Sequence, residues 1–106
     1  MQAQMATGKA YCLSHENRTR IRTILMREWD PIGVRNIPGA PEDEYDAYID
    51  GICELLGDPY PSKEKLAAYL LDVQTRKMLL RVTPAALERC TRAADCLMAT
   101  VVESPP

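Results

Sequence analysis

Apolar residues return every three or four positions along most of this 106-residue chain, which is the spacing of helices that bury one face. Ser14, Ser62 and Thr83 each precede such a stretch, and short hydroxyl side chains cap the first turn of a helix. Gly57, followed by a segment with two prolines, ends the second stretch. The pattern predicts an all-α fold, a compact four-helix domain with helices at about 15–29, 42–56, 62–78 and 84–101.

The second and fourth helices carry the most detailed packing predictions. Pro84 suits the first helical position, and Val82 is expected to pack on Leu87 across this helix start. The expected buried face of the fourth helix consists of Leu87, Cys90, Ala94, Leu97, Met98 and Val101. The expected buried face of the second helix consists of Tyr45, Tyr48, Ile49, Ile52, Leu55 and Leu56. We expect a single helical domain over residues 13–102, an N-terminal tail over 1–12 whose order is left open, and a frayed C-terminus over 103–106.

A turn of unusual composition interrupts the helical pattern after the only tryptophan. Proline keeps the preceding aspartate out of helical geometry, and proline and glycine occupy positions that a tight turn favours. The aspartate carboxylate is expected to accept backbone N–H groups or to pair with an arginine. One interpretation buries the tryptophan with the neighbouring isoleucine and valine, and the alternative exposes it as a partner anchor. The turn residues are Trp29, Asp30, Pro31, Ile32, Gly33 and Val34.

The same turn carries a resemblance to a family of small uncharacterised bacterial helical proteins. Those proteins have a Trp-Asp-Pro-Ile-Gly-Val turn, a downstream Glu-Tyr-Asp-x-Tyr element and a helix with a Tyr-Leu pattern. The matching positions here are Trp29–Val34, Glu44–Tyr48 and Tyr69-Leu70, and the resemblance covers about residues 21–78. It implies a small α-helical fold of unassigned activity, with an association with toxin-neutralising or other partner-binding roles.

Charge is distributed unevenly, although the net charge is only −2. Residues 42–58 contain seven acidic residues and no lysine or arginine, whereas residues 63–92 contain seven basic and three acidic residues. Asp46, Asp50 and Glu54 are four residues apart, so a helix would place them in one row of like charge. Either basic residues of neighbouring helices offset this row, or a basic partner does. In the second case Asp46, Tyr48, Asp50 and Glu54 form the predicted partner-binding site.

The chain offers little for catalysis or metal binding. Its four cysteines, Cys12, Cys53, Cys90 and Cys96, form no Cys-x-x-Cys pair, and we expect free buried thiols in a reducing cytosol. The single histidine, His15, lies near Cys12, but the end of a chain holds catalytic geometry poorly. We therefore predict no catalytic residues, no metal site and no cofactor.

These observations favour a non-catalytic protein-binding domain, with an immunity or antitoxin-like adaptor as the most concrete form. The alternative is a DNA-binding helical domain that uses the basic residues of helices three and four. The start of the chain lacks the basic and apolar regions of a secretory signal, and no apolar run is long enough for a membrane span. We expect a bacterial, cytoplasmic protein with a basic protein partner and no membrane or nucleic-acid contact, as a monomer or a homodimer.

Overall fold

The computed structural model describes residue 12 and residues 14–103, and all regular secondary structure in this part of the chain is helical. The all-α prediction and the four main helices are confirmed. Two of these helices end in a π-helical turn, in which an N–H group bonds the carbonyl five residues earlier. The elements are α2 (His15–Ile24) with a π-helical turn (Leu25–Trp29), a 3₁₀ turn (Val34–Asn36), a 3₁₀ turn (Asp46–Tyr48), α3 (Ile49–Leu56), α4 (Lys63–Asp72) with a π-helical turn (Val73–Lys77), and α5 (Pro84–Glu103).

The predicted capping residues begin their helices as expected. The Ser14 hydroxyl accepts a hydrogen bond from the Asn17 N–H, and Ser62 does the same at the start of α4. The Thr83 hydroxyl accepts the Ala86 N–H over 3.0 Å at the start of α5. Each cap satisfies a backbone donor that has no partner inside the helix, which is why these boundaries can be read locally.

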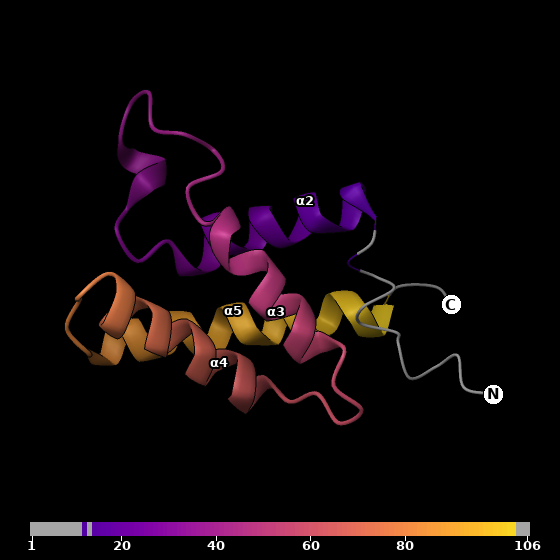
Figure 1. The fold of residues 1–106 in the computed structure, drawn as a ribbon. Helices are drawn as coiled ribbons and strands as arrows, with labels where there is room; N and C mark the ends of the chain where they lie inside the picture. The colour runs from indigo at the N-terminus through magenta and orange to yellow at the C-terminus, as the bar shows by residue number, and fades with distance from the viewer. Residues whose placement is uncertain (1–11, 13, 104–106) are drawn as a thin grey trace.

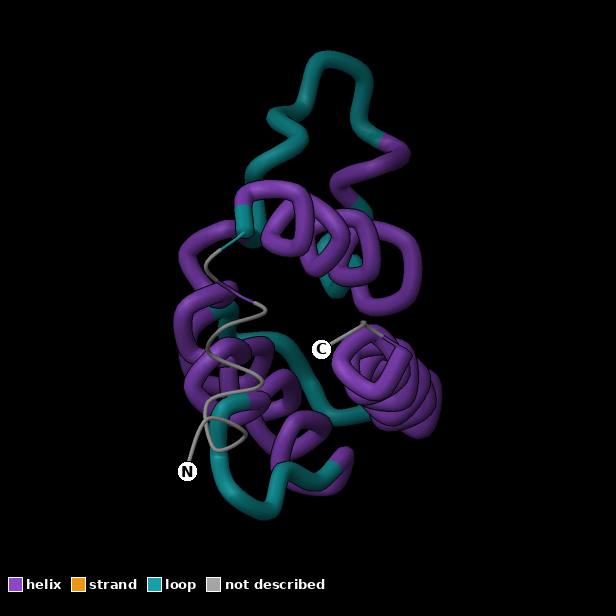
Figure 2. Tube along the Cα trace, turned by 90° about the vertical axis from the view of Figure 1, so that its right-hand side faces the viewer, coloured by secondary structure: helices purple, strands orange, loops and turns teal. Residues whose placement is uncertain are grey.

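The helices pack in a closed ring of contacts. α4 and α5 lie side by side, α2 packs on α5, and α3 bridges α2 and α4 (Figure 1). One segment leaves this arrangement. Residues 31–44, which we call the arm, project away from the helices in both orientations (Figures 1 and 2). The arm joins the π-helical turn after α2 to the 3₁₀ turn before α3.

The core is built around Trp29, whose side chain is 0% exposed. Its indole N–H donates to the side-chain oxygen of Gln74 over 3.0 Å, and the Cys90 thiol lies 3.4 Å from the same oxygen. The ring centroids of Tyr45 and Tyr48 lie 5.2 and 6.1 Å from the centroid of the tryptophan ring. Of the two interpretations of Trp29, the structure supports burial and excludes the exposed anchor, and Gln74 supplies the acceptor that a buried indole N–H requires.

The second helix begins later than predicted. Residues 42–45 form turns, and regular α-helix starts at Ile49 instead of residue 42. The N–H groups of Asp46 and Tyr48 bond carbonyls only three residues earlier. Tyr45 is drawn into the core against Trp29, so tertiary packing overrides the helical pattern of this segment.

The buried face of α5 is rotated by about one residue from the predicted face. Ala86 is buried, whereas Leu87 is 44% exposed, and Val82 is exposed as well. Val82 and Leu87 therefore do not form the expected buried staple. The rest of the predicted face is buried or packs against the core, including Cys90, Ala94, Leu97, Met98 and Val101. The helix continues to Glu103, two residues beyond the predicted end.

The predicted termini are only partly described. Residues 1–11 of the expected tail and residues 104–106 of the expected frayed end lie outside the described part of the chain. Cys12 is described, and its side chain is buried.

Candidate functional site

Asp30 fixes the point at which the arm leaves the core. It adopts left-handed backbone geometry (φ 31°), which is uncommon for a residue other than glycine. Its buried carboxylate accepts the Val34 N–H over 2.7 Å and the Tyr45 hydroxyl over 2.6 Å. The guanidinium of Arg35 lies 3.7 Å away. Both partners that the sequence predicted for Asp30, turn N–H groups and an arginine, are therefore present.

The remaining turn residues divide into buried and exposed. Gly33 has a φ of 68°, and its N–H bonds the Asp30 carbonyl over 3.1 Å, which closes the predicted tight turn. Val34 is buried, as expected. Ile32 was expected beneath Trp29 but is 43% exposed, because the turn directs it out of the core. The turn is thus structural at its base and apolar on its outer side.

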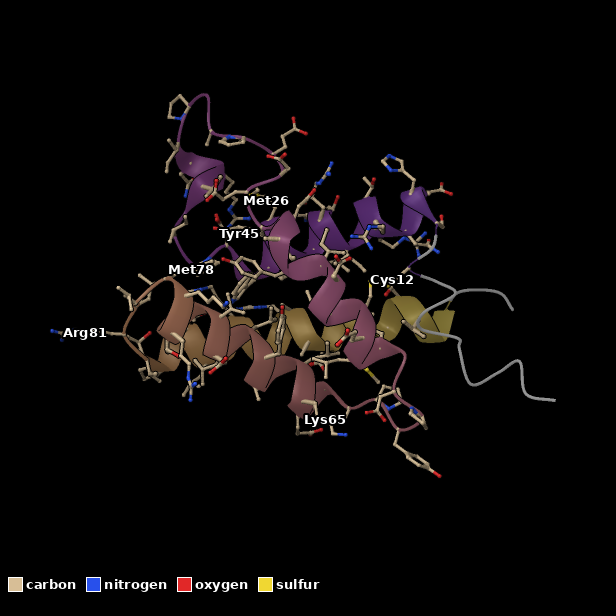
Figure 3. The ribbon with its side chains drawn as sticks, in the orientation of Figure 1. Cys12, Met26, Tyr45, Lys65, Met78 and Arg81 are labelled. Carbon is tan, nitrogen blue, oxygen red and sulfur yellow. A yellow bond between two sulfur atoms is a disulfide. The ribbon has the colours of Figure 1, made fainter. Side chains whose placement is uncertain are left out.

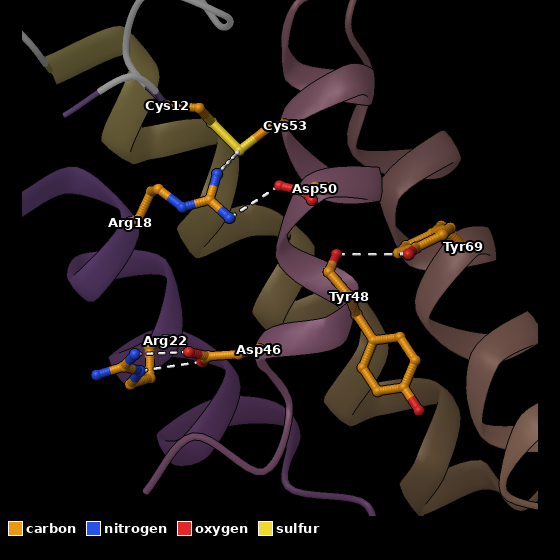
Figure 4. Close-up of polar contacts among 8 residues, drawn as sticks. All are labelled: Cys12, Arg18, Arg22, Asp46, Tyr48, Asp50, Cys53 and Tyr69. Atoms are coloured by element: carbon orange, nitrogen blue, oxygen red, sulfur yellow. Dashed lines mark hydrogen bonds and ion pairs between the residues drawn. A yellow bond between two sulfur atoms is a disulfide. The ribbon is translucent and has the colours of Figure 1, made fainter. Parts of the chain in front are cut away.

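The predicted acidic row is largely paired inside the chain (Figure 4). Asp46 accepts two hydrogen bonds from Arg22, one of them 3.0 Å long from Nε. Asp50 accepts a 2.8 Å bond from Arg18. Hydrogen bonding to Asp46, reinforced by its charge, raises the pKa of Arg22. Asp46 also precedes α3, so the three acids do not form a row on one α-helix.

The four residues of the predicted partner-binding site consequently differ in how freely they could contact a partner. Glu54 is exposed and has no ion-pair partner among the described residues. Asp50 is paired, yet its side chain is 85% exposed. Asp46 is held by two hydrogen bonds from Arg22, and Tyr48 is half-buried with its ring nearly perpendicular to that of Trp29.

A disulfide corrects the expectation that all four cysteines are free. The sulfur atoms of Cys12 and Cys53 are bonded, and this bond ties the chain before α2 to α3 (Figure 4). The nearest Arg18 nitrogen lies 3.9 Å from the Cys53 sulfur. The prediction failed because the two cysteines are 41 residues apart and only the fold brings them together. The pairing also removes the Cys12 thiol from any Cys-His pair with His15.

The two other cysteines are free thiols, as predicted. Cys90 is buried and Cys96 is partly exposed. Burial raises the pKa of both thiols above the ordinary value, so neither is activated as a thiolate nucleophile.

The tyrosine hydroxyls of this region act as structural donors. Tyr69 donates to the Tyr48 carbonyl over 3.4 Å, and this contact links α4 to the start of α3 (Figure 4). A Cβ atom at position 51 would collide with the Tyr69 ring, so Gly51 permits the close approach of the two helices. Burial is the main cause that raises the pKa of Tyr69. Tyr45 was predicted only as a core residue, and its bond to Asp30 was missed.

A cleft lies between α2 and the arm. Its volume is about 330 Å³. The π-helical turn after α2 contributes Met26 to its wall, and the arm contributes Val34, Ile37 and Pro41. Met26 lies at the foot of the arm in Figure 3. Arginine side chains from both elements and Glu42 complete the lining, so the cleft has an apolar interior and a charged rim.

The basic residues of helices three and four are mostly paired with acids. Four ion pairs, none longer than 3.7 Å, join Lys63 to Asp95, Lys65 to Asp58, Arg76 to Asp72, and Arg92 to Glu28. Lys77, Arg81 and Arg89 have no ion-pair partner among the described residues. Arg89 is partly buried, whereas Lys77 and Arg81 are exposed, and Arg81 points away from the bundle at the α4–α5 connection (Figure 3).

Two further findings bound the chemistry of the described residues. No group of three or more His, Cys, Asp or Glu side chains in this part of the chain is placed to hold a metal ion. Among the described helices, none is both long and apolar enough to cross a membrane. Comparisons with known protein families, with curated proteins and with solved structures find no match to this chain.

Proposed function

We propose that this chain is a non-catalytic protein-binding domain that recognises a basic partner through the arm, with an immunity or antitoxin-like adaptor as the most concrete form. The observation that carries the proposal is the construction of the arm. Its base is fixed by the buried Asp30 carboxylate, while its outer surface presents apolar and acidic side chains to solvent.

The apolar part of this surface consists of two isoleucines. Ile32 is 43% exposed and Ile37 is 52% exposed. Large apolar side chains that stay in contact with water beside charged residues are a feature of protein-binding surfaces. Because hydrogen bonds at its base already order the arm, a partner would lose less conformational entropy on binding it.

The acidic part supports a basic partner. Of the seven acids in residues 42–58, Asp46, Asp50 and Asp58 have basic partners within the chain. The other four are exposed without an ion-pair partner among the described residues, and they are Glu42, Asp43, Glu44 and Glu54. Three of these four lie on the arm. Asp50 joins this surface because an ion pair so exposed is worth little and exchanges partners readily.

Of the four residues of the predicted acidic face, only two remain candidates for contact with a partner. We propose that Asp50 and Glu54 continue the arm's acidic surface along α3 and mainly steer association. Asp46 instead keeps a structural role with Arg22, and Tyr48 contacts Trp29. Acidic residues lie within 3.7 Å of Lys63, Lys65, Arg76 and Arg92, and their negative charge would repel the phosphates of a nucleic acid, which favours a protein partner over DNA.

A matched pair of variants tests this proposal. Ile32→Ser with Ile37→Ser removes the exposed apolar groups of the arm, and Leu79→Ser with Val82→Ser removes comparable groups at the α4–α5 connection. A partner is first captured from lysate of the source cells and identified. We expect the arm variant to lose more than about tenfold in affinity for that purified partner, and the control to retain it. Both variants should have melting temperatures close to that of the parent chain.

The opposite pattern would overturn the proposal. Retained affinity in the arm variant, with loss in the control, would move the binding surface to the α4–α5 connection. Retention of DNA at about 50 mM salt would favour the nucleic-acid alternative, since phosphate contacts are strong at low salt. Replacing Asp50 and Glu54 with Asn and Gln should slow association more than it speeds dissociation.

A further inference from the structure

We propose that the cleft between α2 and the arm receives one large apolar side chain, an aromatic ring by preference, from a basic segment of the partner. This inference rests on the proposed protein-binding function and names the contact by which the partner is recognised. Its basis is the combination of an apolar interior, a volume that admits one large side chain, and the exposed acidic residues with which the arm continues beyond the rim.

The volume of the cleft limits its occupant. At about 330 Å³ it lies at the lower end of ligand sites, so it suits a single side chain rather than an extended cofactor. Met26 and Ile37 face this space from opposite elements, and Val34 is buried beneath it. Such walls favour an apolar group, and a flexible methionine adapts to the shape of an inserted ring.

The arginines at the rim are mostly committed to other contacts. Arg22 is bound to Asp46 by two hydrogen bonds. Arg35 lies beside Asp30 and donates to the Arg27 carbonyl over 3.1 Å. Arg27 alone among these three has no ion-pair partner in the described part of the chain.

The remaining charge selects a cation. Glu42 lines the cleft, and Asp43 and Glu44 follow it; all three are exposed and lack ion-pair partners among the described residues. Three unpaired carboxylates against the one unpaired guanidinium leave a local charge of about −2, which attracts lysine or arginine side chains beside the inserted group. Arg27 can then lie over the face of an aromatic ring, where a guanidinium is attracted by the π electrons.

Two small probes of the same shape and opposite charge test the inference without the partner. Tryptamine carries an ammonium group on an indole ring, and indole-3-acetate carries a carboxylate. Each is titrated into the full, isotope-labelled chain while the backbone amide signals are followed by NMR. We expect tryptamine to shift the amides of Met26, Val34 and Ile37, with affinity about threefold or more above that of indole-3-acetate.

Variants separate the apolar contribution from the charge. Ile37→Ala should weaken both probes, and its matched control Val82→Ala, also an exposed aliphatic residue, should weaken neither. Replacing Glu42, Asp43 and Glu44 with Gln, Asn and Gln should abolish the preference for tryptamine while the indole ring still binds.

Two results would overturn the inference. Equal or tighter binding of indole-3-acetate would show that the cleft selects an anion. Absence of shifts at the cleft with either probe would show that it takes no aromatic group. In both cases the proposed function stands or falls separately, since the arm variant with two serines measures affinity for the whole partner.

Discussion

The disulfide between Cys12 and Cys53 leads to the most direct prediction about stability. It joins Cys12, which precedes α2, to Cys53 in α3, and it encloses α2 and the arm in one covalent loop. We consider the double variant Cys12→Ser, Cys53→Ser, which removes the bond without leaving an unpaired thiol. Both side chains are small and buried, so the change in packing is modest.

The expected loss follows from the length of that loop. For a sequence separation of 41 residues, the entropy of the unfolded chain that the bond removes corresponds to about 4 kcal/mol at 25 °C. Measured losses are usually about 2–4 kcal/mol, because the unfolded state keeps some structure. A domain of this size is stable by about 5–15 kcal/mol, so the variant should be folded but markedly weaker.

Chemical unfolding with and without reductant provides the assay. We expect dithiothreitol to lower the guanidinium midpoint of the parent and to leave the double variant unchanged. Cys96→Ser is the control, since this cysteine is free and partly exposed, and its midpoint should respond to reductant as the parent does. Thiol titration of the unreduced, denatured parent should count two thiols among its four cysteines.

Four free thiols, together with a midpoint that ignores reductant, would refute this reasoning. The chain would then behave as the sequence alone suggested, with the cysteines acting as small apolar residues. A count of two thiols with no change in midpoint would instead show that the bond forms but does not constrain the unfolded chain.

Two other predictions concern the core. Trp29→Ala should lower the free energy of unfolding by about 3–5 kcal/mol, because it leaves a cavity and an unpaired Gln74 oxygen; a melting temperature within two degrees of the parent would contradict this. Burial, together with the hydrogen bond to Asp30, raises the pKa of Tyr45 above its ordinary value of 10.0. The protonated hydroxyl therefore stabilises the folded state fully below about pH 10, and this contribution is lost as the pH rises toward the pKa of the folded state. Unfolding midpoints at pH 9 and pH 11 should therefore fall less steeply in Tyr45→Phe than in the parent.

The sequence by itself determined the four main helices, the N-terminal caps of three of them and the turn that starts the arm. Ser14, Ser62 and Thr83 bond N–H groups three residues away, and Asp30 bonds the backbone four residues away. Such contacts form within a few residues whatever the rest of the chain does. For Trp29 the sequence offered burial and an exposed anchor as alternatives, and the structure decided for burial.

The tertiary structure alone decided which distant groups meet. Asp46 pairs with Arg22 at a sequence separation of 24 residues, and Asp50 pairs with Arg18 at a separation of 32. Cys12 bonds Cys53 at a separation of 41. The same packing drew Tyr45 onto Trp29 and delayed the start of α3. It also created the cleft, whose walls come from two elements. No local rule specifies these pairs, because their approach depends on how the helices cross, and that is set by the summed burial of side chains from all four.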